Sequence, residues 1–243
     1  MNNFDFLPID VQLNYDKQKL VSFFHQYAQK APTWWNIVVI REPIDSNSLI
    51  PNYHTLDAVK FKWNPDCEWA WMPEFEEQFP LLIDDLNEKL PYSKITNVML
   101  MSNYTVVHPH NDISNYDPEV DNVQNARIVL GGDMEPSSYR VLIDGSLDDT
   151  FFLSDPNVGE ESGRKWLELD PTPGVDYNYK TVRMPEDTNV MVFPTFSITH
   201  GALIPESPKI ILSIHGFLDK DRHNELLQKS YERYKDYAVS YFE

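Results

Sequence analysis

The sequence predicts a mainly β protein with flanking helices, and its pattern changes twice along the chain. Over residues 94–218, short β-like apolar runs alternate with turns rich in Gly, Pro and Asp. That spacing is typical of sandwiches, barrels and jelly rolls. Helical periodicity precedes and follows this region. We expect a single domain (1–243) with a helical and irregular N-terminal part (1–93), the β core and a C-terminal helix (219–243).

The N-terminal part shows helix signals at two places. Asn14 or Asp16 can cap a first helix that Pro32 ends, and Pro80 lies near the first turn of a second helix. Between them lies an apolar run with strand character. The predicted elements are a helix at 15–31, a strand at 34–40, an irregular Trp-rich stretch at 41–72 and a helix at 80–90.

The β core contains eight strand-like runs, each bounded by turn residues. A stretch at 154–178 is rich in Pro, Gly and Asp, so we expect a long loop there, and such loops are often lids. The predicted strands are 95–107, 126–131, 138–143, 149–153, 179–184, 189–193, 197–204 and 209–217.

The C-terminal segment has the period of an amphipathic helix. Asp219 or Asp221 can cap its first turn, and a mixed set of charged residues forms its polar face. The expected apolar stripe consists of Leu227, Tyr231, Tyr234, Ala238 and Tyr241.

Composition excludes several classes of protein. The chain has 243 residues, 42% of them hydrophobic, and a formal net charge of −18, which argues against nucleic acid or an anionic membrane surface as partner. One cysteine, Cys67, fits a reducing compartment. Neither a signal peptide nor an apolar run long enough to span a membrane is visible. We expect a cytoplasmic protein.

Two histidines and one carboxylate suggest a metal site. His110 and Asp112 follow a β-like run and would lie on the same side of a regular strand, and His200 comes from a distant strand. Two His and one carboxylate that leave coordination positions open form the ligand set of non-haem Fe(II) oxygenases. The alternative is a loop pair sharing a hydrogen bond, with His200 a satisfied histidine in a sandwich.

The His-x-acid pair alone is weak evidence, because roughly one such pair is expected by chance in a chain this acidic. A second pair, His223 and Glu225, occurs in the predicted C-terminal helix. No later histidine follows to complete a site there, so we interpret that pair as part of a solvated helix face. What distinguishes the first pair is the strand before it and the His-bearing strand that follows.

Lys209 opens the last strand of the β core. On a regular strand Lys209, Ile211, Ser213 and His215 share one face. An ammonium group with a hydroxyl group farther along that face can hold a carboxylate through a salt bridge and a hydrogen bond. Lysine acts here as a point charge, whereas arginine would bind bidentately. The alternative is an edge-strand lysine that deters aggregation.

These motifs resemble the Fe(II)/2-oxoglutarate-dependent oxygenase superfamily, and within it the aspartyl/asparaginyl β-hydroxylase type. The resemblance covers about residues 75–218. It rests on a His-x-Asp…His pattern followed by a basic residue and an apolar strand. The similar segments are Phe79-Pro80 at the head of a helix, Pro109-His110 after a strand, the run 127–131, the run 189–194 before His200, and Lys209 with its strand.

The resemblance implies a double-stranded β-helix (jelly-roll) core with His110, Asp112 and His200 as Fe(II) ligands. It also implies that Lys209 binds 2-oxoglutarate and that Arg127 contacts this cosubstrate. The alternative for Arg127 is a structural or surface role. Weaker candidates for the cosubstrate site are Ser213 and Tyr104, and His215 is either a group behind the metal ligands or a core histidine.

The function implied is a 2-oxoglutarate-dependent dioxygenase. It would use O2 to hydroxylate an unactivated C–H bond of an amino-acid side chain, free or in a peptide, and release succinate and CO2. Asp112 favours hydroxylation, because halogenases of the superfamily replace that acid. Lys209 in place of arginine, the long segment 113–126 and the 154–178 loop depart from the pattern and bear on the substrate. Two alternatives stay open: a cupin-like metalloenzyme without 2-oxoglutarate, and a non-enzymatic β-sandwich binding module.

Overall fold

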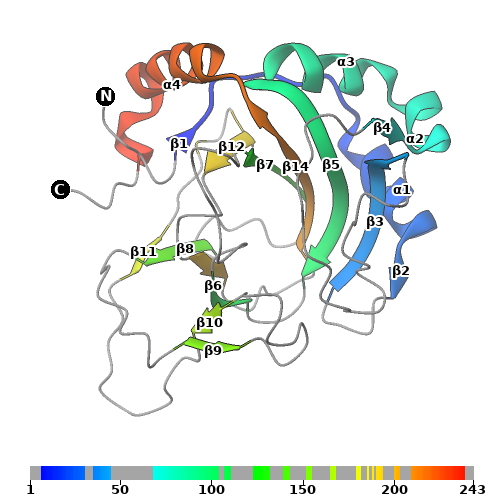
Figure 1. The fold of residues 1–243 in the computed structure, drawn as a ribbon, viewed down its shortest axis with the longest axis horizontal. Coiled ribbons are helices and arrows are strands. Elements are labelled where there is room, and N and C mark those ends of the chain that lie inside the picture. Colours follow the sequence, from blue (N-terminus) through cyan, green and yellow to red (C-terminus); the bar gives the residue numbers. More distant parts are fainter. Residues whose placement is uncertain are drawn as a thin grey trace.

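The computed structural model describes residues 7–30, 35–44, 68–103, 107–110, 123–131, 139–142, 152–154, 165–167, 179–181, 185, 188, 190–193, 200–202 and 209–238. Within these ranges the chain forms two antiparallel β-sheets and four α-helices (Figure 1). The predicted fold class, mainly β with flanking helices, is confirmed at that level. Across the described residues no helix is long and apolar enough to cross a membrane.

The larger sheet has eight strands in the order β1-β12-β7-β14-β5-β3-β2, and β4 pairs with β3 off that path. Its long central strands are β5, β14 and β7, and β14 lies between strands that come far earlier in the chain. The strands are β1 (Leu7–Pro8), β2 (Gln29–Lys30), β3 (Trp35–Pro43), β4 (Trp69–Trp71), β5 (Tyr92–Asn103), β7 (Val123–Gly131), β12 (Val190–Phe193) and β14 (Lys209–Leu218).

The smaller sheet has six strands in the order β11-β8-β13-β6-β10-β9. Figure 1 shows it apart from the helices, beyond the opposite face of the larger sheet. Its strands are short: β6 (Val107–His110), β8 (Tyr139–Leu142), β9 (Phe152–Ser154), β10 (Lys165–Leu167), β11 (Tyr179–Thr181) and β13 (His200–Ala202).

The chain passes repeatedly between the two sheets. It runs from β5 in the larger sheet to β6 in the smaller, back to β7, and out again to β8. After β11 it alternates once more, through β12, β13 and β14. Strands that neighbour one another in a sheet are therefore seldom consecutive in sequence.

The four helices are amphipathic or begin at proline. The first carries apolar residues at the helical period, and the next two each have Pro at their first position, where the missing N–H costs no hydrogen bond. The helices are α1 (Lys17–Tyr27), α2 (Pro73–Gln78), α3 (Pro80–Lys89) and α4 (Lys220–Tyr234), with a 3-10 turn, η4 (Lys235–Tyr237), after the last.

The main core lies between the helices and one face of the larger sheet. Leu20 and Phe23 of α1 and Leu86 of α3 pack in one buried cluster with Leu100 of β5 and Leu212 of β14. Edge-to-face contacts of Phe23 with neighbouring aromatic rings add specific geometry to this burial. Burial of this apolar surface fixes which face of β5 and β14 the helices cover.

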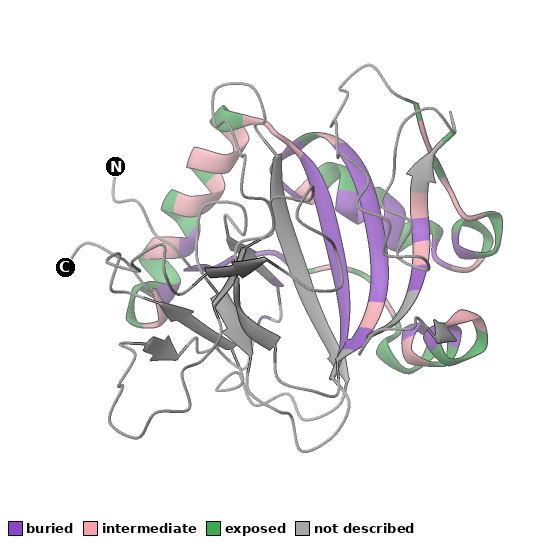
Figure 2. Ribbon diagram, turned by 60° about the horizontal axis from the view of Figure 1, so that its bottom comes forward, coloured by how far each residue is buried: buried purple, intermediate pink, exposed green. Residues whose placement is uncertain are grey.

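The opposite face of the central strands is buried as well. Along β14, Ile210, Leu212 and Ile214 belong to the helix-side core, so the alternating residues Ile211 and Ser213 belong to the other face. Both are nevertheless buried. Figure 2 shows β5 and β14 buried over most of their length. The strands are thus covered on both sides, as in the middle layer of a layered domain.

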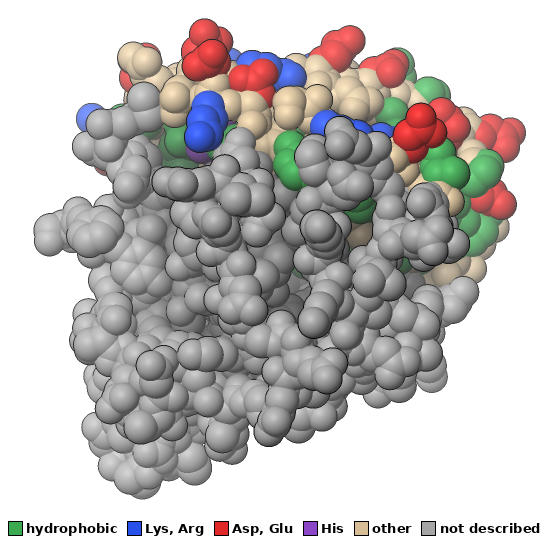
Figure 3. Space-filling model, viewed as in Figure 1, with side chains coloured by type: hydrophobic (Ala, Val, Ile, Leu, Met, Phe, Trp, Pro, Cys, Tyr) green, Lys and Arg blue, Asp and Glu red, His purple; other side chains and the backbone are tan. Residues whose placement is uncertain are grey.

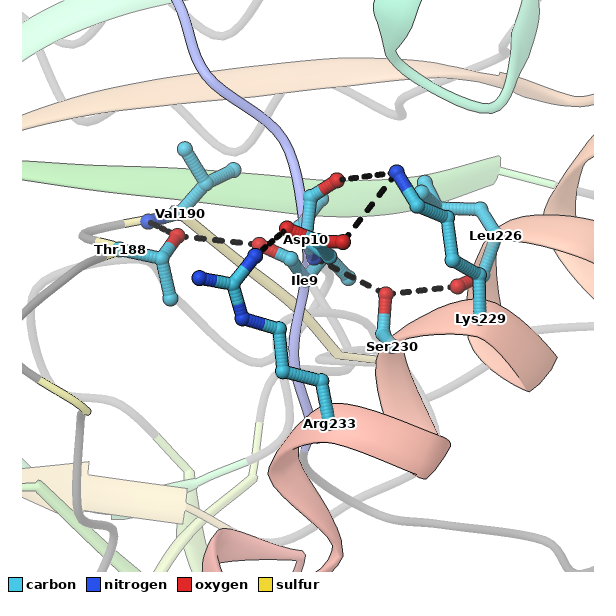
Figure 4. A network of polar contacts seen from close by, with 8 residues as sticks. All are labelled: Ile9, Asp10, Thr188, Val190, Leu226, Lys229, Ser230 and Arg233. Carbon is cyan, nitrogen blue, oxygen red and sulfur yellow. Dashed lines mark hydrogen bonds and ion pairs between the residues drawn. The ribbon is translucent and has the colours of Figure 1, made fainter.

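A clasp of polar contacts joins the N-terminal segment to α4 and β12 (Figure 4). The Asp10 amide donates to the Ser230 hydroxyl at 2.9 Å, and the Asp10 carboxylate pairs with Arg233 at 2.6 Å and with Lys229 at 3.2 Å. On the other side Ile9 exchanges hydrogen bonds with the β12 region. The clasp holds β1 beside β12 and α4 beside both.

Helix boundaries differ from the prediction at three points. The first helix ends at Tyr27 because Ala28 adopts an extended backbone, so residues 29–30, predicted helical, pair with β3. A short helix, α2, precedes the predicted one at 80–90. The last helix ends at Tyr234 rather than near residue 241.

The apolar stripe predicted for the last helix is confirmed at Tyr234 but is out of phase before it. Its buried positions are Ser230 and Tyr234, with Leu226 packed against the core, whereas Leu227 and Tyr231 are only half-buried. The buried face therefore includes a serine, which the clasp accommodates by hydrogen bonding.

Most predicted strands are present with shifted ends, and the corrections concern short or displaced pieces. The strand predicted at 95–107 begins at Tyr92, and Val107 opens a different strand, β6, in the other sheet. The stretch 41–72, predicted irregular, contains the end of β3 and all of β4. The predicted loop 154–178 contains β10, which pairs with β6 and β9. The N-terminal part thus contributes strands to the larger sheet besides the one predicted.

Candidate functional site

The two predicted histidine ligands, His110 and His200, are far apart in sequence but directly opposite one another in the smaller sheet. β13 pairs with β6 in antiparallel register, with His200 opposite His110. Residues directly opposite in an antiparallel pair have Cβ atoms about 4.5–5.5 Å apart on one face. The register is irregular just beyond, between His200 and Ala202, as is common next to active sites. The fold therefore brings the two histidine positions to one point.

The third predicted ligand, Asp112, lies outside the described residues, as does the cosubstrate candidate Tyr104. Considering only what the structure describes, no three His, Cys, Asp or Glu side chains gather as a metal site. His110 ends β6, so Asp112 follows directly after the strand that carries it. The set of three ligands, His110, Asp112 and His200, stays a prediction. The backbone bears on it only through the pairing of His110 with His200.

The cosubstrate candidates lie on the central strands of the larger sheet. Ser213 of β14 is opposite Arg127 of β7 and, on its other side, opposite Met99 of β5. Lys209 opens β14 opposite Asn103, the last residue of β5. The register is regular from Lys209 to Ser213 on the β5 side, so both belong to the face that lies away from the helices. Three of the four predicted cosubstrate residues thus share one face of the sheet.

Ser213 is enclosed despite its hydroxyl group. It is 1% exposed. Buried hydroxyl groups in native structures are nearly always hydrogen-bonded. Ile211, between Lys209 and Ser213 on that face, is also buried and separates the two polar positions with an apolar one.

Sequence reasoning missed Asn97 and Thr96 of β5. The pairing of β5 with β14 shifts at this point, so both residues oppose His215. The Thr96 hydroxyl donates to the His215 carbonyl at 3.1 Å. Asn97 is buried, and within the described residues the oxygen and nitrogen of its side-chain carboxamide have no hydrogen-bond partner. Two polar residues amid the apolar run 95–101 were the signal available in sequence.

The second His-x-acid pair, predicted to lie on a solvated helix face, is only partly solvated: Glu225 is exposed as predicted, whereas His223 is half-buried. Burial lowers the pKa of its imidazole to about 4, and its Nδ1 has no hydrogen-bond partner in the described part of the chain. The imidazole is therefore neutral at pH 7. Its helix neighbour Arg222 donates to the Tyr92 and Glu88 carbonyl groups, which ties α4 to the start of β5.

The tryptophan-rich segment is only partly described. Trp71 stacks on Phe75 with ring centroids 5.9 Å apart, and the Arg41 guanidinium lies 4.6 Å from the centre of the Trp71 ring. Burial lowers the pKa of Arg41, and the Glu76 charge opposes that shift. Trp71 also packs against the main core, which favours a packing role for this residue over a place in a substrate pocket.

In Figure 3 the helices lie along the upper and right-hand edge of the molecule, where acidic side chains are numerous and basic ones lie between them. Glu74, Glu76 and Glu77 of α2 and Asp84 and Glu88 of α3 are all exposed. This edge carries part of the chain's net charge of −18.

Comparison with known proteins gives distant structural similarity. No protein-family model matches the chain. No curated protein matches it. The solved structures found similar include the epimerase SnoN with Fe3+, alpha ketoglutarate and nogalamycin RO, at 12% identity and a TM-score of 0.42, covering 88% of this chain and 79% of that one.

A second structure, of the non-heme alpha ketoglutarate dependent epimerase SnoN from nogalamycin biosynthesis, matches at 10% identity and a TM-score of 0.41, covering 88% of this chain and 78% of that one. A third, of E. coli ycfD, matches at 13% identity and a TM-score of 0.30, covering 91% of this chain and 59% of that one. Because these scores are low, the proposals below rest on the residues and register of this chain.

Proposed function

We propose that this chain is an Fe(II)/2-oxoglutarate-dependent dioxygenase. The observation that carries the proposal is the register of β13 against β6, which puts His200 opposite His110. Two histidine positions directly opposite each other in the sheet, next to the segment that holds Asp112, fit the two-histidine, one-carboxylate ligand set of non-haem iron. His110, Asp112 and His200 would hold the metal.

The strand order supports a double-stranded β-helix. β5, β14, β7 and β12 are consecutive neighbours in the larger sheet, and β6, β13, β8 and β11 are neighbours in the smaller one. Along the chain these strands alternate between the sheets except at β8 and β11, which pair with each other in the smaller sheet. That order is the one that two interlocked Greek keys require. In such a core the ligands sit on the small sheet and face the large one.

The cosubstrate site is proposed on the larger sheet. Lys209 would pair with a carboxylate of 2-oxoglutarate, and the Ser213 hydroxyl would donate to it. Arg127, opposite Ser213, would add a second positive charge to the same face. An ion pair in a site enclosed like that of Ser213 is less screened than one on the surface. Tyr104, in the segment after β5, is a further candidate.

The reaction proposed is hydroxylation of an unactivated C–H bond in an amino-acid side chain, free or in a peptide. Iron and 2-oxoglutarate supply the oxidising chemistry with O2, and succinate and CO2 are released. The residues of the chain bind both, orient the substrate and exclude water from the space between the sheets.

Anaerobic titration with Fe(II) and 2-oxoglutarate tests the proposal. Wild-type protein should develop a weak visible charge-transfer band, and the His110→Ala variant should lose it. His25→Ala, at an exposed position on α1, is the matched control and should keep it. A wild-type spectrum that does not change on addition of both would reject the proposal. A band equal in His110→Ala and wild type would reject this ligand set.

A further inference from the structure

Asn97 of β5 buries a carboxamide that nothing in the proposed iron and cosubstrate sites uses. The residue is 1% exposed, and among the described residues neither its side-chain Oδ1 nor its Nδ2 has a hydrogen-bond partner. Burial of an unpaired donor and an unpaired acceptor on one residue is costly, and native proteins keep few of them. A hydrogen-bonding partner from outside the chain would remove that cost.

Alternation along β5 shows which face Asn97 belongs to. Val98 and Leu100 lie in the core on the helix side. Asn97 and Met99 therefore belong to the other face, where Ser213 and His215 of β14 also lie. His215 is opposite Asn125 of β7. Asn97, His215 and Asn125 thus form a polar end of this face, two residues farther along each strand than Met99, Ser213 and Arg127.

Chain connections relate this polar end to the two histidines. β12 ends at Phe193, which is opposite Asn125, and the next strand begins at His200. β6 ends at His110, and the chain returns to the larger sheet at Val123, just before Asn125. Each histidine therefore lies at the end of its strand from which the chain connects to the polar end of the larger sheet, formed by Asn97, His215 and Asn125. Lys209 enters the sheet at the opposite end of β14.

We propose that Asn97 recognises a neutral group of the substrate that both donates and accepts hydrogen bonds, namely a carboxamide, a peptide amide or a hydroxyl group. This rests on the proposed function in that the recognised molecule is the substrate oxidised at the histidine site. The carboxamide offers one acceptor and two donors, so a neutral amide satisfies both of its ends at once.

A charged group fits the same position poorly. A carboxylate would accept from Nδ2 but leave Oδ1 facing a second acceptor, and an ammonium group would leave Nδ2 facing a donor. The positions of Lys209 and Arg127 supply charge elsewhere on this face and suit the anionic cosubstrate. Asn97 would thus separate substrate recognition from cosubstrate binding.

Thermal unfolding of the full chain without ligands is the first test. Asn97→Leu keeps the shape of the side chain and removes the unpaired amide, so its Tm should rise by about 2–6 °C. Thr96→Val is the matched control, since that hydroxyl is buried on the same strand but already donates to His215; its Tm should fall. A lower Tm for Asn97→Leu would overturn the proposal, because it would show that the protein itself uses the amide.

Ligand protection is the second test. L-asparagine and L-glutamine, with L-aspartate and L-glutamate as charged counterparts, would be added to protein loaded anaerobically with Fe(II) and 2-oxoglutarate. The amide of each pair should raise the Tm of wild type more than the acid does. Asn97→Leu should lose at least about tenfold in apparent affinity for the amide, which corresponds to the loss of one or two hydrogen bonds. N-acetylglycinamide extends the test to peptide amides.

Failure of this inference and failure of the proposed function give different results. If the charge-transfer band is present and no amide is preferred, or if Asn97→Leu keeps the preference, recognition by Asn97 is overturned alone. If the band is absent while amides still protect wild type through Asn97, the site stands and the dioxygenase assignment falls.

Discussion

His200 at the start of β13 lies opposite His110 at the end of β6. An antiparallel pair holds such residues at a nearly fixed separation, whatever the connecting segments do. A metal that binds both side chains therefore links two strands of the smaller sheet, and its affinity enters the folding equilibrium.

Metal binding should stabilise the protein through both histidines. With Co(II) as a redox-stable probe at about 100 times its Kd, the free energy of unfolding should rise by about 2.7 kcal/mol in wild type. His200→Ala should abolish most of that gain. Differential scanning calorimetry with and without Co(II) measures it, and His25→Ala is the control. Equal stabilisation of His200→Ala and wild type would contradict the assignment.

Ser213 lies between Met99 and Arg127 on neighbouring strands, on the same face as Lys209. If this face binds 2-oxoglutarate, mutation of its polar residues should weaken that binding. Ser213→Ala should weaken 2-oxoglutarate binding by about 10- to 150-fold, since one hydrogen bond to a charged group is worth about 1.5–3 kcal/mol. Lys209→Ala should weaken it more and suppress succinate release. Isothermal titration measures the affinity, and Lys220→Ala on the exposed start of α4 is the control for charge alone. Succinate release that persists in Lys209→Ala would move the cosubstrate site elsewhere.

The clasp around Asp10 makes a prediction about which of its contacts matters most. Lys229 and Arg233 are exposed, so each ion pair contributes only about 0.2–1 kcal/mol. Ser230 is fully buried and accepts from the Asp10 amide. Ser230→Val would leave that N–H unpaired and should cost about 1–3 kcal/mol, more than Lys229→Ala. Urea unfolding compares them; the reverse order would show that the ion pairs dominate.

The sequence revealed the fold class because most strands are short apolar runs between strong turn signals. It missed β4 and β10, whose three residues each are strands only because a partner strand lies beside them. The shifted stripe of α4 has a similar origin. Ser230 is buried through a bond to Asp10, 220 positions away in the chain, and local periodicity carries no trace of that contact.

The candidate site could be assembled from sequence only as a set of residue types. Spacing by two residues placed Lys209 and Ser213 on one face, and the register of β14 agrees with it. The pairing of His110 with His200 depends on the order of the strands in the smaller sheet, which no local pattern encodes. Asn97 was overlooked because its significance depends on burial without a partner, a property of the packed structure.

Gly216 on β14 should not tolerate a side chain. A Cβ built there would lie 2.6 Å from Cγ of Tyr92 and 2.8 Å from the Lys94 carbonyl oxygen. The ring is itself buried and the carbonyl belongs to the backbone, so neither can move freely. Gly216→Ala should lower the free energy of unfolding by about 1–3 kcal/mol. Chemical denaturation measures this, and a neutral result would mean that the two strands are less closely packed at this point.

Acid should destabilise the protein through His223. Its pKa is lowered to about 4 in the folded protein by burial, whereas in the unfolded chain an imidazole has its ordinary value of about 6.5. Between these values the unfolded state binds the extra proton, so the free energy of unfolding falls as the pH drops below about 6.5. By pH 5 the loss from this one group should be on the order of 1–2 kcal/mol.

The many carboxyl groups of the chain also titrate in acid, so the test for His223 is a difference between two proteins. His223→Leu keeps an apolar side chain in the same space and cannot be protonated. Denaturant unfolding at pH 7 and pH 5 should show a smaller loss of stability for His223→Leu than for wild type, by about the amount assigned to the imidazole. His25→Leu, exposed on α1, should lose as much as wild type. Equal losses in His223→Leu and wild type would mean that the imidazole reaches water in the folded protein and titrates there as it does in the unfolded chain.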